Sequence, residues 1–154
     1  MDKGQNGAQL SRMTTRPFPA RSPAEMVGGL VHFGRMLDKI RAHANGEIPA
    51  DYIPNLGKGF DGRSVRFLGV SYDDLVARVQ QGGTDDEILR WAFAKGRRPS
   101  EEEMEIWNEF MRKCGWRDNI SETLVRRKKE SGLTERDDIE TMFQYIDADE
   151  GREL

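Results

Sequence analysis

The sequence predicts an all-α protein, a compact single domain of about six or seven helices with one long functional loop. Three observations carry this prediction. Small polar residues recur just before apolar stretches, with an acidic residue three positions later, as in helix capping boxes. Glycines follow the same stretches, as they do where helices end. The alternation of apolar and polar residues that is typical of strands never persists.

Six cap and acid pairs mark the expected helix starts: Ser22 with Glu25, Ser71 with Asp74, Thr84 with Glu87, Ser100 with Glu103, Asn119 with Glu122, and Thr134 with Asp137. The matching stops are Gly46, Gly69, Gly82, Gly96, Gly115 and Gly132. We therefore expect helices near 23–45, 62–68, 72–81, 85–95, 101–114, 120–131 and 135–148. The first of these is expected to be the longest element.

The helical domain is expected to span residues 22–148. Residues 1–21 lack any periodicity, which predicts a flexible N-terminal arm, and residues 149–154 are expected to form a flexible acidic tail. Within the domain, Trp91, Trp107 and Phe110 fall on the apolar sides of their helices and are predicted to belong to the core.

Composition limits the classes of function. The chain has 154 residues, 33% of them charged, and a formal net charge of -3, so no global positive field attracts nucleic acid, which is not an expected partner. No apolar run approaches a membrane span, and the N-terminus lacks a secretory signal, so we expect a cytoplasmic protein with no membrane association. The single cysteine, Cys114, excludes an intramolecular disulfide and is expected to be buried by packing. No metal-binding motif or cofactor motif occurs, so neither a metal nor a cofactor is predicted.

A polar stripe runs along the first expected helix, beside its apolar face. It consists of Gly28, His32, Arg35, Lys39 and His43. Glycines 28, 29 and 34 occupy helix positions where alanine would be more stable by up to about 1 kcal/mol each. This local conflict suggests a close backbone approach or a binding site.

The connection over residues 46–61 is unusually long, with two prolines and three glycines. Loops of this length without their own regular structure are often functional. Its apolar residues Tyr52, Ile53, Leu56 and Phe60 argue that the loop packs on the preceding helix. A packed loop beside the polar stripe is the predicted pocket.

The stripe and the loop together suggest a site for a small anionic molecule. Arg35 and Lys39 are placed to bind a carboxylate or phosphate, with Asn55 as a further ligand contact. His43, Tyr52 and His32 are the candidate catalytic residues for proton transfer. His43 is expected to matter more than His32, because it lies where the helix meets the loop. Alternatively, Arg35, Asp38 and Lys39, which have the spacings of three and four residues typical of ion pairs within a helix, form such pairs or a solvated face.

Part of the chain resembles a bacterial family known only as a domain of unknown function. The resemblance covers about residues 16–110 and rests on the segment from Arg21 to Leu30, the run from Gly34 to His43, Tyr52, and the Phe67–Val70 segment. It is strongest over Gly34–His43. It implies a small helical domain and brings no reaction or catalytic residues.

Two classes of function follow from these observations. The first is binding of a small anionic metabolite, with general acid/base chemistry of the kind that cofactor-independent lyases and isomerases carry out by elimination, isomerisation or proton abstraction. The second is a non-catalytic helical module for protein–protein interaction, in a homodimer or with another protein.

Overall fold

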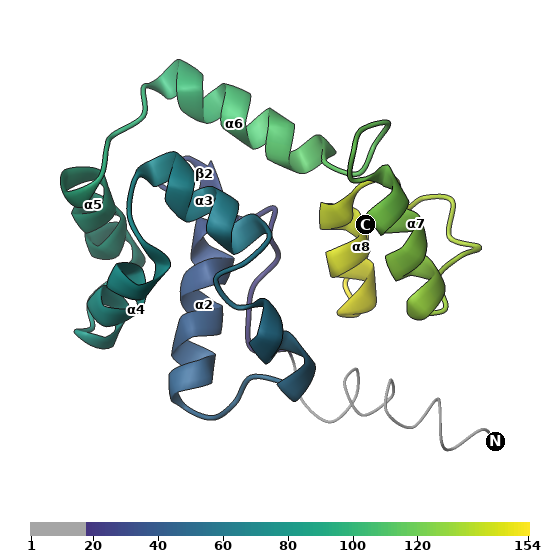
Figure 1. The fold of residues 1–154 in the computed structure, drawn as a ribbon, viewed down its shortest axis with the longest axis horizontal. Helices are drawn as coiled ribbons and strands as arrows, with labels where there is room; N and C mark the ends of the chain where they lie inside the picture. The colour runs from purple at the N-terminus through teal and green to yellow at the C-terminus, as the bar shows by residue number, and fades with distance from the viewer. Residues whose placement is uncertain (1–17) are drawn as a thin grey trace. The chain divides into compact units, whose positions relative to one another are not determined.

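Helices dominate the structure, a computed structural model that describes residues 18–154 (Figure 1). The elements in chain order are β1 (Met26–Val27), β2 (Leu30–Val31), α2 (Phe33–Ala44), η1 (Ala50–Asn55), α3 (Phe60–Leu68), α4 (Tyr72–Gln80), α5 (Asp85–Lys95), α6 (Glu101–Lys113), α7 (Ser121–Glu130) and α8 (Met142–Asp149). The helix-dominated fold predicted from the sequence is confirmed. Most of the predicted N-terminal arm, residues 1–17, lies outside the described residues.

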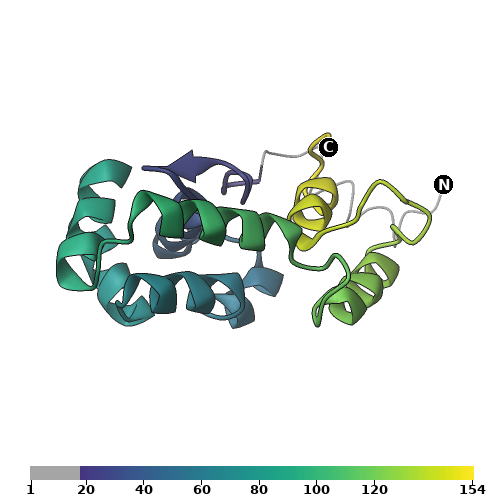
Figure 2. The same ribbon diagram turned by 90° about the horizontal axis from the view of Figure 1, so that it is seen from above.

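The predicted helix over residues 23–45 is wrong up to residue 32, because α2 begins at Phe33. Residues 26–31 form an antiparallel hairpin, in which Met26 pairs with Val31 and Val27 with Leu30 (Figure 2). The two turn residues, Gly28 and Gly29, have φ angles of +56° and +86°, which glycine adopts without strain. The helix that follows has 12 residues, so the 13-residue α6 is the longest helix of the described chain.

The hairpin explains the glycines that conflicted with a helix. Ser22 does not cap a helix. Its hydroxyl accepts a hydrogen bond from the Ala24 N–H within a tight turn. Gly34 does mark a close approach, since a Cβ there would lie 2.7 Å from Nη1 of Arg21 and 2.9 Å from Cγ2 of Val27. The segment Ser22–Glu25 has the sequence pattern of a helix start, but it precedes the hairpin.

Three of the other predicted caps are confirmed. The side chains of Ser71, Thr84 and Ser100 each accept a hydrogen bond from the backbone three residues later. The cap at Asn119 is wrong, because the N-cap position of α7 is Ile120. The cap at Thr134 is also wrong. The last helix begins after Thr141, whose hydroxyl accepts a hydrogen bond from the N–H of Gln144.

Residues 19–109 form one structural unit, and residues 110–154, with residue 18, form another. The core of the first unit is built on α2, whose Phe33, Met36, Leu37 and Ile40 are buried. It also takes buried side chains from the hairpin, α3, α4 and α5. Trp91 and Trp107 are partly buried and pack against this core, as their apolar positions predicted.

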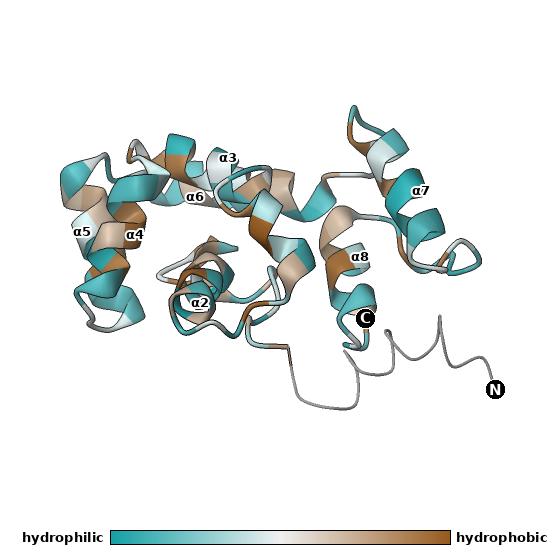
Figure 3. Cartoon of the chain, turned by 60° about the horizontal axis from the view of Figure 1, so that its bottom comes forward, coloured by the Kyte–Doolittle hydropathy of each residue, from teal (hydrophilic) through white to brown (hydrophobic). Residues whose placement is uncertain are grey.

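The second unit has a smaller apolar cluster of Leu124, Ile139 and Tyr145. Much of α7 is hydrophilic (Figure 3). Cys114 is buried, as expected. The prediction for Phe110 is wrong, since this residue is 47% exposed.

The long connection between α2 and α3 is less irregular than predicted. It contains the 3-10 helix η1, and α3 begins at Phe60 rather than at residue 62. Tyr52, Leu56 and Phe60 are half-buried, whereas Ile53 is exposed. Ile48, which the sequence analysis did not single out, is the buried apolar residue of this segment.

Candidate functional site

The N-terminal end of α2 carries a buried histidine in an uncommon backbone conformation. His32, the N-cap residue of α2, has a φ of 69° and a ψ of -25°, in the left-handed region. Its side chain is only 2% exposed. Backbone bonds hold it on both sides, from its N–H to the carbonyl of Pro23 at 2.8 Å and from the N–H of Met36 to its own carbonyl at 3.0 Å. Non-glycine residues in this region are strained, and such strain often marks functional positions.

Asp61, in the first turn of α3, is bonded to two polar side chains of this part of the chain. Its Oδ1 lies 2.8 Å from Nε2 of His32 and accepts a hydrogen bond from Nζ of Lys39 at 2.9 Å. Its Oδ2 accepts hydrogen bonds from Nζ of Lys39 at 3.0 Å and from the Gly57 N–H at 3.1 Å. We call His32, Lys39 and Asp61 the polar cluster. It joins α2, α3 and the connection between them.

The polar cluster has shifted protonation equilibria. Burial lowers the pKa of His32 below its ordinary value of 6.5, against the opposing effect of the Asp61 carboxylate. Burial by itself would raise the pKa of Asp61, but the hydrogen bond from His32 and the charge of Lys39 outweigh it and lower that pKa to about 2. Near neutral pH the cluster therefore combines a neutral imidazole, a carboxylate and an ammonium group. An ionised Asp61 accepts a hydrogen bond, so Nε2 of His32 carries the ring proton.

Aromatic residues enclose the cluster. The ring of Phe60 meets that of His32 edge to face, with centroids 5.9 Å apart. Burial raises the pKa of the Tyr72 phenol, and the Asp61 charge adds to this effect. Tyr72 also packs on the connection, because a Cβ on Gly57 would lie 2.8 Å from its ring. The cluster thus has apolar walls, which strengthen its electrostatic interactions.

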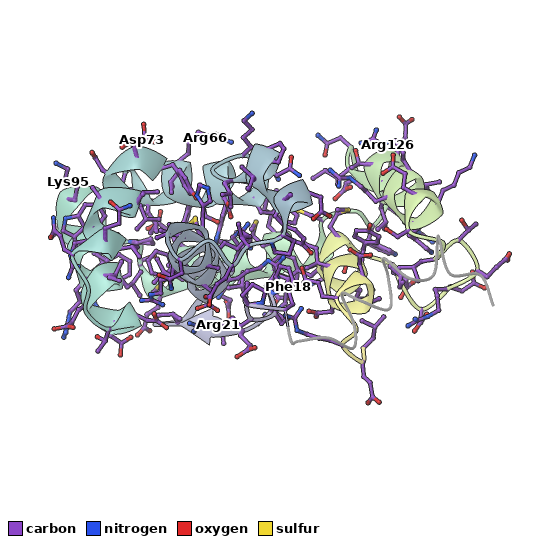
Figure 4. All side chains as sticks on the ribbon, turned by 90° about the horizontal axis from the view of Figure 1, so that it is seen from below. Phe18, Arg21, Arg66, Asp73, Lys95 and Arg126 are labelled. Carbon is purple, nitrogen blue, oxygen red and sulfur yellow. The ribbon has the colours of Figure 1, made fainter. Side chains whose placement is uncertain are left out.

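Arg35 does not face the same partner as Lys39. It is buried, and its Nη1 donates to the backbone carbonyl of Arg21 at 3.1 Å. Arg21 lies beside α2 (Figure 4) and forms a two-point ion pair with Asp38, with bonds of 2.8 Å each. It also reaches Asp85, 2.9 Å away. Asp38, the expected partner of Arg35 and Lys39 within the helix, pairs with Arg21 and with Arg41, and Lys39 pairs with Asp61 on α3.

The remaining candidate residues lie at the other end of α2 and in the connection. His43 is exposed in the last turn of α2, and Asn55 is exposed at the end of η1. Tyr52, within η1, is half-buried. A rise of 1.5 Å per residue separates the backbones of His32 and His43 by about 16 Å. The structure therefore brings together His32 and Lys39 but places His43 at the opposite end of the helix.

Sequence reasoning missed Asp61, which completes the cluster. An acidic residue in the first turn of a helix is ordinarily explained by the helix dipole, and this masked its role. One signal was available: His32 and Lys39 are seven residues apart on one helix face, and a buried lysine requires a counter-charge. The long connection ends at the first turn of α3, where Asp61 could supply that charge.

No group of three histidine, cysteine, aspartate or glutamate side chains suited to a metal ion occurs within residues 18–154. Among the helices of the same residues, none has the length and apolar character of a membrane span.

The chain matches the model of a known protein family. The family model described as "Domain of unknown function (DUF5069)" matches residues 17–152. The chain belongs to this family. The match of the DUF5069 domain extends through α7 and α8, beyond the resemblance evident from the sequence. No curated protein matches the chain.

Proposed function

We propose that this protein binds a small anionic molecule beside Lys39 and that His32 transfers a proton to or from it. The single observation that carries the proposal is the buried, hydrogen-bonded His32–Asp61–Lys39 cluster, built on a strained backbone. Removing charges from water is expensive, and apolar side chains of similar volume are often equally stable or more so. Buried titratable groups with shifted pKa values therefore favour a functional site over a purely structural one.

The roles follow from exposure and protonation. Lys39 is the most exposed member of the cluster, with 12% of its side chain accessible, against 2% for His32 and 1% for Asp61. An incoming carboxylate or phosphate would interact first with its ammonium group. Asp61 would hold the proton on Nε2 of His32, which leaves Nδ1 as the basic nitrogen. A neutral imidazole whose orientation is fixed by a carboxylate is suited to general base catalysis.

The hydroxyl of Ser64 supports the proposal that a polar ligand binds near this site. Ser64 lies one turn after Asp61 on α3, so both residues point to the same side of the helix. Its hydroxyl is buried and has no hydrogen-bond partner within the described part of the chain. An unsatisfied buried hydroxyl calls for a bound water or ligand. The reaction class we propose is elimination, isomerisation or proton abstraction, for which acid/base groups suffice.

His43, in the last turn of α2, and Tyr52 and Asn55, in η1, are the alternative candidates for the same activity. The two locations can be separated by isothermal titration calorimetry. The full chain would be titrated with a panel of small anions that includes inorganic phosphate, acetate, pyruvate and citrate. Lys39→Met keeps the alkyl stem and removes the charge, while His43→Gln serves as the matched control at the other end.

We expect a binding anion to lose at least tenfold in affinity in Lys39→Met and to retain its affinity within twofold in His43→Gln. A binder that tolerates Lys39→Met but not His43→Gln would move the site to the second location. An anion bound equally well by both variants and by Arg35→Ala would make the stripe structural.

A protein–protein interaction module is the second candidate function, favoured by a specific observation on α6. Ile106 and Phe110, one turn apart, are exposed by 63% and 47%. Apolar side chains at this spacing are typical of helices that bind in a groove of a partner. Light scattering after size exclusion would reveal a homodimer, and Ile106→Glu should then produce the monomer.

A further inference from the structure

Asn108 on α6 makes hydrogen bonds to the turn and to the second strand of the hairpin, which lies almost 80 residues earlier in the sequence. Its Oδ1 accepts a hydrogen bond from the Val31 N–H at 3.0 Å, and its Nδ2 donates one to the Gly29 carbonyl at 2.7 Å. Nδ2 also contacts Sδ of Met26 at 3.7 Å. The side chain is buried, with 7% of the residue exposed. A single amide thus satisfies a backbone donor and a backbone acceptor of the hairpin.

The hairpin needs such support. Each of its strands has two residues, and an isolated two-stranded hairpin is marginally stable even when it is longer. Val31, whose N–H the amide binds, directly precedes His32. The left-handed conformation of His32 is strained, so it persists only where the surrounding contacts determine the backbone on both sides.

We propose that Asn108 is a positioning residue that holds the hairpin so that His32 keeps its left-handed conformation and points its imidazole at Asp61. This inference rests on the proposed function, since it assigns His32 the chemistry. Asn108 acts on His32 indirectly, through its hydrogen bonds to the backbone of Gly29 and Val31. It therefore differs from the residues of the polar cluster.

The test is a spectroscopic signature of His32 in the ligand-free full chain. Long-range ¹⁵N–¹H spectra of the imidazoles report the tautomer and the titration of each histidine. The chain has two histidines, so the exposed His43 is an internal reference. Asn108→Leu keeps most of the buried volume and removes both hydrogen bonds, Asn108→Ser is the milder variant, and Glu105→Gln changes an exposed residue of the same helix as a control.

We expect wild type and Glu105→Gln to show His32 as the Nε2–H tautomer, with a pKa below the ordinary value of 6.5. In Asn108→Leu, and to a smaller extent in Asn108→Ser, the His32 signals should shift toward a tautomer mixture, and the titration midpoint of His32 should rise by at least 0.5 pH units toward 6.5. Unchanged His32 signals in a destabilised Asn108→Leu would overturn the proposal and leave Asn108 a structural contact only. Unfolding of both variants would also contradict it, because a positioning contact does not hold the whole fold.

The outcome is independent of ligand binding. If wild type binds no anion but the His32 signals still respond to Asn108→Leu, the proposed function fails while the positioning role stands. The reverse result would retain the anion site and reject the role of Asn108.

Discussion

The two ends of α2 each carry a histidine, and the two environments are opposite. At the N-terminal end, His32 is buried, strained and paired with Asp61. At the C-terminal end, His43 is exposed in the last turn, and the chain leaves through Gly46. The same residue type on the same helix thus has two different physical roles. The difference comes from residues distant in sequence, since Asp61 and Asn108 reach only the N-terminal end.

The two ends also differ in what a substitution would disturb. Asp61 ties the side chains of His32 and Lys39 to α3, so removing one member of the polar cluster leaves its partners without compensation. The side chains of His43 and Asn55 are exposed, so they can exchange protein contacts for water. Substitutions should therefore have large and coupled effects at the first end and small, additive effects at the second.

The largest expected effect is that of Asp61→Ala. This change leaves the buried His32 and the partly buried Lys39 without their counter-charge, and breaking a buried ion pair typically costs about 3–5 kcal/mol. Urea denaturation monitored by circular dichroism would measure the loss of unfolding free energy. The control is Asn55→Ala at the exposed end, which should cost less than about 0.5 kcal/mol. Similar losses in the two variants would erase the contrast between the ends.

A second prediction compares the glycines that flank α2. Gly28→Ala places a Cβ 2.3 Å from Cδ2 of the buried Leu89 and forces alanine into a φ of +56°. We expect a loss of about 3 kcal/mol, from the left-handed conformation and the overpacked core together. Gly46 has a φ of +69°, but a Cβ there would meet open space. Gly46→Ala should therefore lower the unfolding free energy by only about 1 kcal/mol.

Urea titration of both variants would measure the two losses of unfolding free energy and so test this comparison. An equal loss in the two would mean that Leu89 moves aside without cost, and that the hairpin is less firmly packed than its contacts indicate.

The helices of the fold were predictable because their signals are local. Ser71, Thr84 and Ser100 cap helices through bonds spanning three residues, and the sequence alone carries that spacing. The failures occurred where the same local pattern serves another structure. Thr134 and Asp137 imitate a helix start, but the helix begins after Thr141. Local pattern therefore identifies that a helix is near, and tertiary contacts decide where it begins.

The candidate site was predictable only in part. Periodicity placed His32 and Lys39 on one side of the chain, although residue 32 caps α2 rather than lying within a helix. Nothing local distinguishes Asp61 from any other first-turn carboxylate, and the role of Gly28 and Gly29 as a hairpin turn depends on strands of two residues each, too short to show alternation. The distances that create the polar cluster arise from packing, which a single sequence does not report.

A third prediction concerns pH. The folded pKa of His32 lies below 6.5, so between that value and 6.5 the unfolded chain binds more protons than the folded one. Stability should therefore fall as the pH is lowered through this range, by at most about 1.4 kcal/mol between pH 7.5 and 5.5. The charged groups that act on the His32 imidazole are Asp61, Lys39 and Arg35. The pKa of Asp61, lowered to about 2, keeps its carboxylate ionised throughout this pH range.

His32→Asn should remove this dependence, because asparagine tolerates the left-handed conformation, can donate to Asp61 and does not titrate. Unfolding free energies measured by urea titration at several pH values would show a flat profile for this variant and a sloping one for wild type. A slope that survives in His32→Asn and disappears in His43→Gln would assign the titration to the exposed end and reverse the comparison.

The smallest expected effect is that of His43→Gln on stability. An exposed side chain in the last turn of α2 has no buried partner to leave unsatisfied, so the unfolding free energy at pH 7 should change by less than about 0.5 kcal/mol. A loss above 1 kcal/mol at pH 7 would mean that the C-terminal end of α2 contains a structured site of its own, where His43 acts with residues of the connection.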